Sequence, residues 1–124
     1  MVDRHRELNY REANAEIDRL VGVLARRFGA GAERPVAMMM ENRVEYVLAW
    51  FGTFRLGASG VHVSYRATPE ELAYQLEHSG ARIVLCSERT REVVDEVRRR
   101  RPDWELVAVD TDAERHGEHR YSYR

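Results

Sequence analysis

The chain has 124 residues, of which 44% are hydrophobic and 33% charged, and its formal net charge is −1. This length and composition predict one soluble globular domain and exclude a disordered chain. No apolar run approaches the roughly 20 residues that a membrane-spanning helix needs, and so small a net charge gives no general attraction to nucleic acid or anionic lipid.

The cysteine and lysine content excludes several kinds of structural and catalytic site. The single cysteine, Cys86, excludes an internal disulfide framework and predicts a reducing, cytoplasmic environment. The charged start of the chain, residues 1–7, lacks the apolar core of a signal peptide. All 20 basic residues counted as Lys or Arg are arginine. A GC-rich coding bias explains this composition, but it leaves no lysine for a Walker-type phosphate loop or a Schiff base.

The first predicted element is an amphipathic helix from Asn9 to Phe28. Asn9 and Glu12 have the spacing of a capping box, in which each side chain accepts a hydrogen bond from the other residue's backbone. A short apolar stripe favours a helix packed on a sheet over a coiled coil, and Gly29 ends the helix. The stripe consists of Ala13, Ile17, Leu20, Val21, Leu24 and Phe28.

The stretch from Val36 to Val63 organises the rest of the fold. It contains an apolar run at residues 36–40, a helical pattern at 44–56 and a second apolar run at 61–63. Strand, helix and strand within 28 residues are close to the size of a right-handed βαβ crossover. The stretch therefore predicts a parallel sheet.

The helix of this unit is apolar nearly all round. Asn42 and Glu45 predict its cap, and Gly57 suits the left-handed residue that follows a helix. Such a helix is normally buried on more than one side. Its predicted apolar face is Val44, Val47, Leu48, Phe51 and Phe54, flanked by Tyr46, Ala49 and Trp50.

Two further helices are predicted. Thr68, Pro69 and Glu71 combine a cap, a first-turn proline and a capping-box acid, and the helix that they begin ends at Gly80. Another helix is predicted from about 88 to 101. The inward residues of the two helices are Leu72, Ala73 and Leu76 in the first and Val93, Val94 and Val97 in the second.

Strands precede and follow the last of these helices. Residues 82–86 are too apolar for a one-sided surface sheet, and residues 106–109 form the last predicted strand. The order predicts an α/β fold with a mainly parallel sheet of about four strands and helices on both faces. Residues 111–124 carry few apolar side chains and are predicted to be a polar tail or a truncated connection, which leaves 1–110 as the domain.

Ligands of open parallel sheets bind at the carboxyl ends of the strands. None of the predicted ends is glycine-rich enough to cradle a phosphate. Asn42 is accounted for as a helix cap. Ser64, Tyr65 and Arg66 could contact a ligand, although a loop that is polar for solvation explains them as well. The predicted ends are residues 41–43, 64–66, 87–89 and 110–111.

Four other candidate functional features have ordinary structural explanations. Cys86 ends an apolar strand and is predicted to be a small buried hydrophobe. His116 and His119 match no zinc-hydrolase spacing, so no metal site is predicted. The run 98–101 complements a helix dipole and lacks the aromatic platform of a nucleic-acid site. His62 lies in an apolar strand and is predicted to be a core or interface histidine.

Taken in order, these segments resemble the N-terminal part of adenylate-forming enzymes. That superfamily includes acyl-CoA synthetases, luciferases and the adenylation domains of peptide synthetases. The resemblance covers residues 8–110 and depends on the order and spacing of scaffold motifs. Those motifs are residues 8–14, 34–42, 48–58, 68–76 and 79–82.

Within the superfamily, residues 61–66 look most like fatty acyl-CoA synthetases, whose segment often has asparagine before tyrosine and arginine. His62 and Ser64 depart from that pattern. The resemblance implies that a complete relative uses ATP and magnesium to convert a carboxylic acid into an acyl-adenylate, and then transfers the acyl group to CoA. The family's phosphate loop, ribose-binding motif and catalytic lysine lie downstream of the matched region. No catalytic, cofactor-binding or metal-binding residue is therefore assigned to this chain.

Two classes of function remain open from the sequence. The chain is either an enzyme fragment, inactive alone, or a non-catalytic stand-alone α/β module. A fragment is expected to need its downstream part or to self-associate, because strands such as residues 83–85 invite pairing when they are exposed. A receiver-like or flavodoxin-like domain would need clustered acids or a phosphate loop at the strand ends. An in-frame continuation after codon 124 that encodes the lysine-containing loop would decide for the fragment.

Overall fold

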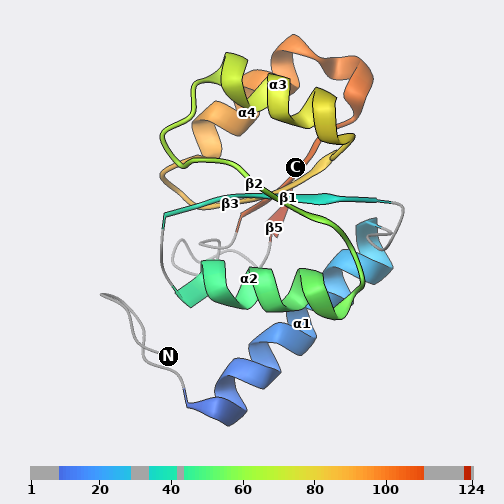
Figure 1. Cartoon of the computed structure of the whole chain (residues 1–124), viewed down its shortest axis with the longest axis vertical. Coiled ribbons are helices and arrows are strands. Elements are labelled where there is room, and N and C mark those ends of the chain that lie inside the picture. The colour runs from blue at the N-terminus through green and yellow to red at the C-terminus, as the bar shows by residue number, and fades with distance from the viewer. Residues whose placement is uncertain (1–8, 29–33, 42–43, 111–121, 124) are drawn as a thin grey trace.

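The computed structural model has three layers, with a sheet between two pairs of helices (Figure 1). It describes residues 9–28, 34–41, 44–110 and 122–123. The helices α1 (Tyr10–Phe28) and α2 (Val44–Arg55) cover one face, and α3 (Pro69–Ser79) and α4 (Arg91–Arg100) cover the other. The remaining elements are β1 (Val36–Met39), β2 (Gly60–His62), β3 (Ile83–Cys86), η1 (Pro102–Trp104), β4 (Val107–Asp110) and β5 (Ser122–Tyr123).

The strand order β2-β1-β3-β4-β5 explains why the helices divide between two faces. The chain moves from β1 outward to β2, and then back across β1 to β3 and on to β4. Because crossovers between parallel strands are right-handed, reversing the direction of travel moves the connecting helix to the opposite face. The helix α2 therefore lies on one side of the sheet, and α3 and α4 lie on the other.

The predicted α/β fold with a mainly parallel sheet is confirmed. β1 to β4 are parallel to one another. The structure adds the two-residue strand β5, antiparallel to β4, in a part of the chain predicted to be a tail. Two residues are too few to show a strand pattern in the sequence. The division of the chain at residue 110 stays a prediction.

Local signals at the helix ends are confirmed where the structure describes them. Asn9 and Glu12 exchange the two hydrogen bonds of a capping box, at 2.8 and 3.2 Å. Thr68 and Glu71 do the same at α3. Gly57 and Gly80 both have positive φ, at 72° and 79°. The cap predicted at Asn42 and the helix end predicted at Gly29 lie outside the described residues.

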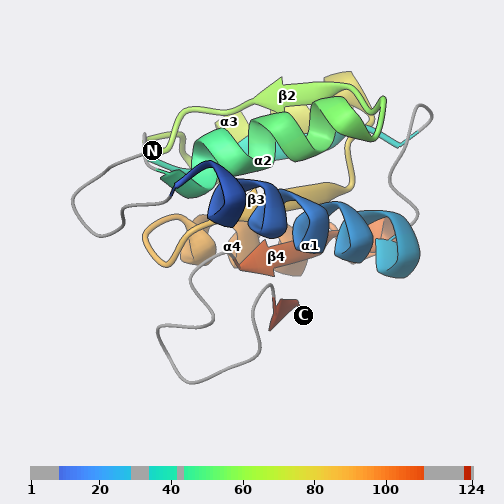
Figure 2. The same ribbon diagram turned by 90° about the horizontal axis from the view of Figure 1, so that it is seen from below.

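The predicted apolar face of α2 is wrong in part. Leu48, Ala49, Gly52 and Thr53 are buried, whereas Phe51 and Phe54 are 50% and 78% exposed. The helix is buried on two sides, as predicted, because Leu48 packs with residues of α1 and Ala49 packs with residues of the sheet. The sheet and α1 both contact α2 (Figure 2), so its orientation follows from two neighbours rather than from its own apolar pattern.

Both faces of the sheet are apolar, as expected for parallel strands between helices. In β1, Ala37 and Met39 belong to the core on the α3/α4 side, and Val36 and Met38 belong to the core on the α1/α2 side. The strand β3 is central and fully buried, so residues 83–85, the example of a strand that would pair if it were exposed, are covered; β2 is an edge strand instead. None of the described helices is both long and apolar enough to cross a bilayer.

Candidate functional site

The carboxyl ends of β1 to β4 lie along one edge of the sheet, because these strands are parallel. From β1 the chain connects to β2 on one side, and from β3 it connects to β4 on the other. The neighbouring ends of β1 and β3 therefore form the switch point of the sheet. Open α/β folds bind ligands at such switch points.

A buried hydroxyl group joins the two strands at the switch point. Thr90 Oγ1 donates a hydrogen bond to the Met39 carbonyl oxygen at 2.6 Å and accepts one from the Ser87 backbone N–H at 3.0 Å. Ser87 and Thr90 are both almost fully buried. The turn between them explains why α4 begins at Arg91 instead of the predicted position 88.

An ion pair fixes the start of α4 to the end of β4. Arg91 Nη1 lies 2.7 Å from Asp110 Oδ2, and the Asp110 side chain is 5% exposed. A buried carboxylate needs such a charged partner. Arg91 and Asp110 therefore support the strand ends.

The ring of Tyr65 is contacted by two guanidinium groups at this edge. The Cζ atoms of Arg66 and Arg89 are 5.3 and 4.8 Å from the centroid of its ring. We call these three residues the Tyr65 cluster. Cation–π contacts of this length hold a guanidinium group against an aromatic ring. Within the described residues no carboxylate pairs with Arg66 or Arg89. Two guanidinium groups that form no ion pair with a described carboxylate make an arrangement suited to an anion such as phosphate, which arginine binds in bidentate geometry.

A shallow groove of about 320 Å³ adjoins this cluster. Tyr46 and His62 lie on one wall and are hydrogen-bonded through the Tyr46 hydroxyl, and the Trp50 ring lies 4.5 Å from the His62 ring. His62 lies on the edge strand β2 and is exposed, so of the two predicted roles, core or interface histidine, the core role is wrong. Tyr65 also lines the groove and connects it to the Tyr65 cluster.

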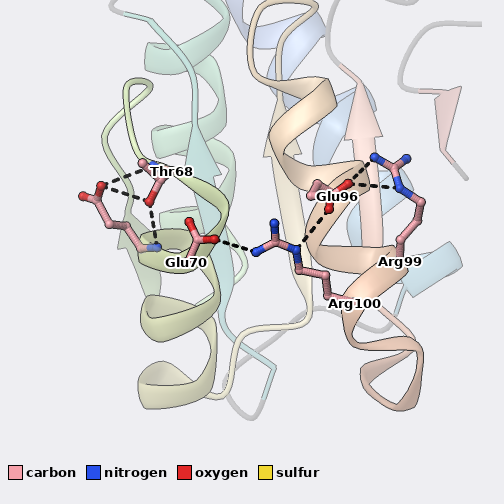
Figure 3. A network of polar contacts seen from close by, with 6 residues as sticks. Thr68, Glu70, Glu96, Arg99 and Arg100 are labelled. Atoms are coloured by element: carbon pink, nitrogen blue, oxygen red, sulfur yellow. Dashed lines mark hydrogen bonds and ion pairs between the residues drawn. The ribbon is translucent and has the colours of Figure 1, made fainter.

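The basic run at the end of α4 is paired with carboxylates (Figure 3). Arg100 bridges Glu70 of α3 and Glu96 of α4, at 2.7 and 3.0 Å. The hydrogen bond from Arg100 lowers the pKa of Glu70, and the same bond raises the pKa of Arg100. The other three pairs are Arg98–Asp95, Arg99–Glu96 and Arg101–Asp103. This pairing supports a structural role for the run.

The remaining candidates contribute no chemistry to the described structure. Cys86 is fully buried, and its thiol contacts the Val109 carbonyl oxygen, which confirms the prediction of a small core residue. Asn42, His116 and His119 lie outside the described residues. Among the residues that the structure does describe, no group of three potential metal ligands occurs.

The Tyr65 cluster is the feature that the sequence did not reveal. Ser64, Tyr65 and Arg66 were candidates by position alone, and Arg89 was one of several residues after a strand. The loops that carry Tyr65 and Arg89 follow β2 and β3, two strands separated by β1. Only the strand order brings these residues together.

Known proteins similar to this chain include CoA ligases and nonribosomal peptide synthetases. Residues 1–122 match the family described as AMP-binding enzyme. The chain is 30% identical over 114 residues to the long-chain-fatty-acid–CoA ligase FadD13 of Mycobacterium tuberculosis, covering 87% of this chain and 22% of that protein. It is 28% identical over 112 residues to the 4-hydroxybenzoate–CoA/benzoate–CoA ligase of Rhodopseudomonas palustris, covering 90% of this chain and 21% of that protein.

The fold is similar to that of the N-terminal domain of one such ligase. The structure resembles the crystal structure of the N-terminal domain of FACL13 from Mycobacterium tuberculosis with a TM-score of 0.66 and 30% sequence identity. The similarity covers 72% of this chain and 22% of that one. The chain thus spans about a fifth of the length of the two ligases that it matches.

Proposed function

Because the chain belongs to the AMP-binding enzyme family and matches the N-terminal part of acid–CoA ligases, we propose that it supplies the first α/β layer of such a ligase. The activity of the whole enzyme would be ATP-dependent formation of an acyl-adenylate from a carboxylic acid, assisted by magnesium, followed by thioester formation with CoA. A fatty acid is the proposed substrate. The similarity to FadD13 and the sequence of residues 61–66 support that choice.

Within this proposal the chain contributes no catalytic residue. It contains no lysine, so it cannot supply the catalytic lysine that the family uses. Its partner would be the remaining part of the enzyme. A cytoplasmic location also stays a proposal, supported by the presence of a single cysteine, Cys86, in the given sequence.

We further propose that the Tyr65 cluster binds a phosphate group of ATP or CoA. The observation that supports this is the pair of guanidinium groups on one tyrosine ring, at the edge of the sheet where α/β folds bind ligands. Both cofactors implied by the family carry phosphates. The adjoining groove, lined by Tyr46, His62 and Tyr65, would accept the apolar part of such a ligand.

The activity proposal is tested by ATP–pyrophosphate exchange with a panel of fatty acids. The 124-residue chain alone should give no exchange above a buffer blank. The same chain expressed with any in-frame continuation of its gene should give fatty-acid-dependent exchange. Exchange by the chain alone would contradict the proposed division of labour, and a continuation without exchange would favour a stand-alone binding module.

The phosphate proposal is tested by titrating CoA and ADP into the chain and following the Tyr65 ring by NMR. Arg66→Gln and Arg89→Gln should each weaken binding by about tenfold to a hundredfold, because a charge-assisted hydrogen bond contributes about 1.5–3 kcal/mol. Arg11→Gln is the matched control, since Arg11 is an exposed arginine on α1. Equal losses in all three variants would indicate nonspecific attraction and contradict the site.

A further inference from the structure

The end of β1 is hydrogen-bonded to both of the loops that carry the Tyr65 cluster. On one side the Met38 carbonyl oxygen accepts a hydrogen bond from the Val63 backbone N–H at 3.0 Å, just before the loop that carries Tyr65. On the other side the Met39 carbonyl oxygen accepts the bond from Thr90 Oγ1 at 2.6 Å, just after Arg89. Successive carbonyls of a strand point to opposite sides, so β1 can hold the two loops at once.

The turn that carries Arg89 is fixed at both of its ends. The Ser87 carbonyl oxygen accepts hydrogen bonds from the backbone N–H groups of Thr90 and Arg91, at 3.2 and 2.9 Å. The Thr90 hydroxyl also accepts a bond from the Ser87 N–H. Of these contacts, only the Thr90 hydroxyl attaches the turn to β1 and therefore to the strand pair that carries Tyr65.

We infer that Thr90 is a positioning residue for phosphate binding: its hydroxyl presets the distance between Arg89 and Tyr65 before a ligand arrives. This inference rests on the proposed phosphate site. A preset guanidinium group loses less conformational freedom on binding than one that must first be ordered, so the hydroxyl should strengthen binding without touching the ligand. Thr90 is almost fully buried, which keeps it out of direct contact with solutes.

The test compares Thr90→Val with Thr90→Ser, using inorganic pyrophosphate as the probe and the full 124-residue chain. Thr90→Val has nearly the same shape as threonine but lacks the hydroxyl, and we expect it to weaken pyrophosphate binding about fivefold. Thr90→Ser keeps the hydroxyl and should restore most of the affinity. In an Arg89→Gln background, Thr90→Val should cause no further loss, because the residue that it positions is absent.

The outcomes separate this inference from the phosphate site itself. If Arg89→Gln leaves pyrophosphate binding unchanged, the site and the inference both fail. If Arg89→Gln weakens binding and a folded Thr90→Val does not, the site stands and the positioning role fails. An equal loss from Thr90→Val with and without Arg89 would also overturn the inference, because the effect would not act through Arg89.

A measurement on the unchanged protein covers the case in which Thr90→Val does not fold. Nuclear Overhauser contacts between the Tyr65 ring and the Arg89 side chain should be present before pyrophosphate is added, since the inference holds that the pair is preset. Contacts that appear only after pyrophosphate is added would overturn the inference.

Discussion

The two faces of the sheet differ in how completely their side chains are buried. On the α3/α4 face a single continuous core joins Leu72 and Leu76 of α3 to Val94 and Val97 of α4 through the sheet. On the α1/α2 face the core is split into two smaller clusters. There, three aromatic residues of α2 remain exposed: Trp50 at 39%, Phe51 at 50% and Phe54 at 78%.

This difference indicates which parts of the chain maintain the fold and which remain available for contact. The α3/α4 face buries the aliphatic side chains of both helices in one core, and the Arg100–Glu70 bridge joins the two helices. The α1/α2 face leaves an aromatic patch of the kind that usually marks a contact with another protein surface. Stability should therefore depend most on the first face and association on the second.

The largest expected effect compares a buried residue of the α3/α4 face with an exposed residue of the α1/α2 face. Leu76→Ala removes a fully buried side chain of α3 and should destabilise the chain by about 2–5 kcal/mol, because it leaves a cavity. Phe54→Ser removes a larger side chain from the exposed side of α2 and should change stability by about 0.5 kcal/mol or less. Urea unfolding measures both. Equal urea midpoints for the two variants would mean that the two faces do not differ in their contribution to stability.

The second prediction concerns association. The exposed aromatic residues of α2 should make the isolated chain self-associate at micromolar concentration, and the double variant Phe51→Ser/Phe54→Ser should shift it toward monomer. Tyr74→Ser on α3 is the control from the other face, since Tyr74 is 65% exposed but belongs to no such patch. Sedimentation velocity measures the association state, and a chain that is monomeric without any substitution would contradict the prediction.

The sequence predicted features that depend on residues close together in the chain better than features that depend on distant residues. The caps at Asn9 and Thr68 depend on residues three positions apart, and their spacing was sufficient to predict them. The orientation of α2 was not predictable to the same degree, because α1 and the sheet together decide which side of it is buried. Strand β5 consists of two residues and pairs with β4, a contact that the sequence pattern does not show.

The candidate site was less predictable for the same reason. Tyr65 and Arg89 are 24 positions apart, on loops that follow strands not adjacent in the sheet. A sequence pattern can place each of them at a strand end but cannot give the strand order. Thr90 has the same difficulty, because its decisive partner is a backbone carbonyl 51 positions away.

The third prediction uses one glycine from each face. Gly57 and Gly80 have positive φ, and an added Cβ atom would meet nothing within 4 Å at either position. Gly57→Ala and Gly80→Ala should therefore each destabilise by about 1 kcal/mol, through backbone strain alone. Similar shifts in the urea midpoint are expected, since the faces differ in packing and not in this turn geometry. An unchanged midpoint for Gly57→Val would show that residue 57 does not hold a positive φ.

The smallest expected effect concerns pH and the bridge between α3 and α4. The hydrogen bond from Arg100 lowers the pKa of Glu70, and bonds from Arg99 and then Arg100 lower the pKa of Glu96. A carboxyl group whose pKa is lower in the folded state stabilises the protein above its unfolded pKa. That contribution is lost as the pH falls through the folded pKa. Acidification below the ordinary glutamate pKa of 4.5 should therefore weaken the α3/α4 contact.

Glu70→Gln tests this directly, because it removes the titrating group and keeps the shape of the side chain. At neutral pH the original chain should be slightly more stable than the variant, and the difference should vanish below the folded pKa of Glu70. Both partners are solvent-exposed, so the difference should be small and should shrink further in high salt, which screens exposed charges. Arg100→Gln should abolish the effect of Glu70→Gln. A difference that persists at low pH would mean that Glu70 acts through packing and not through its charge.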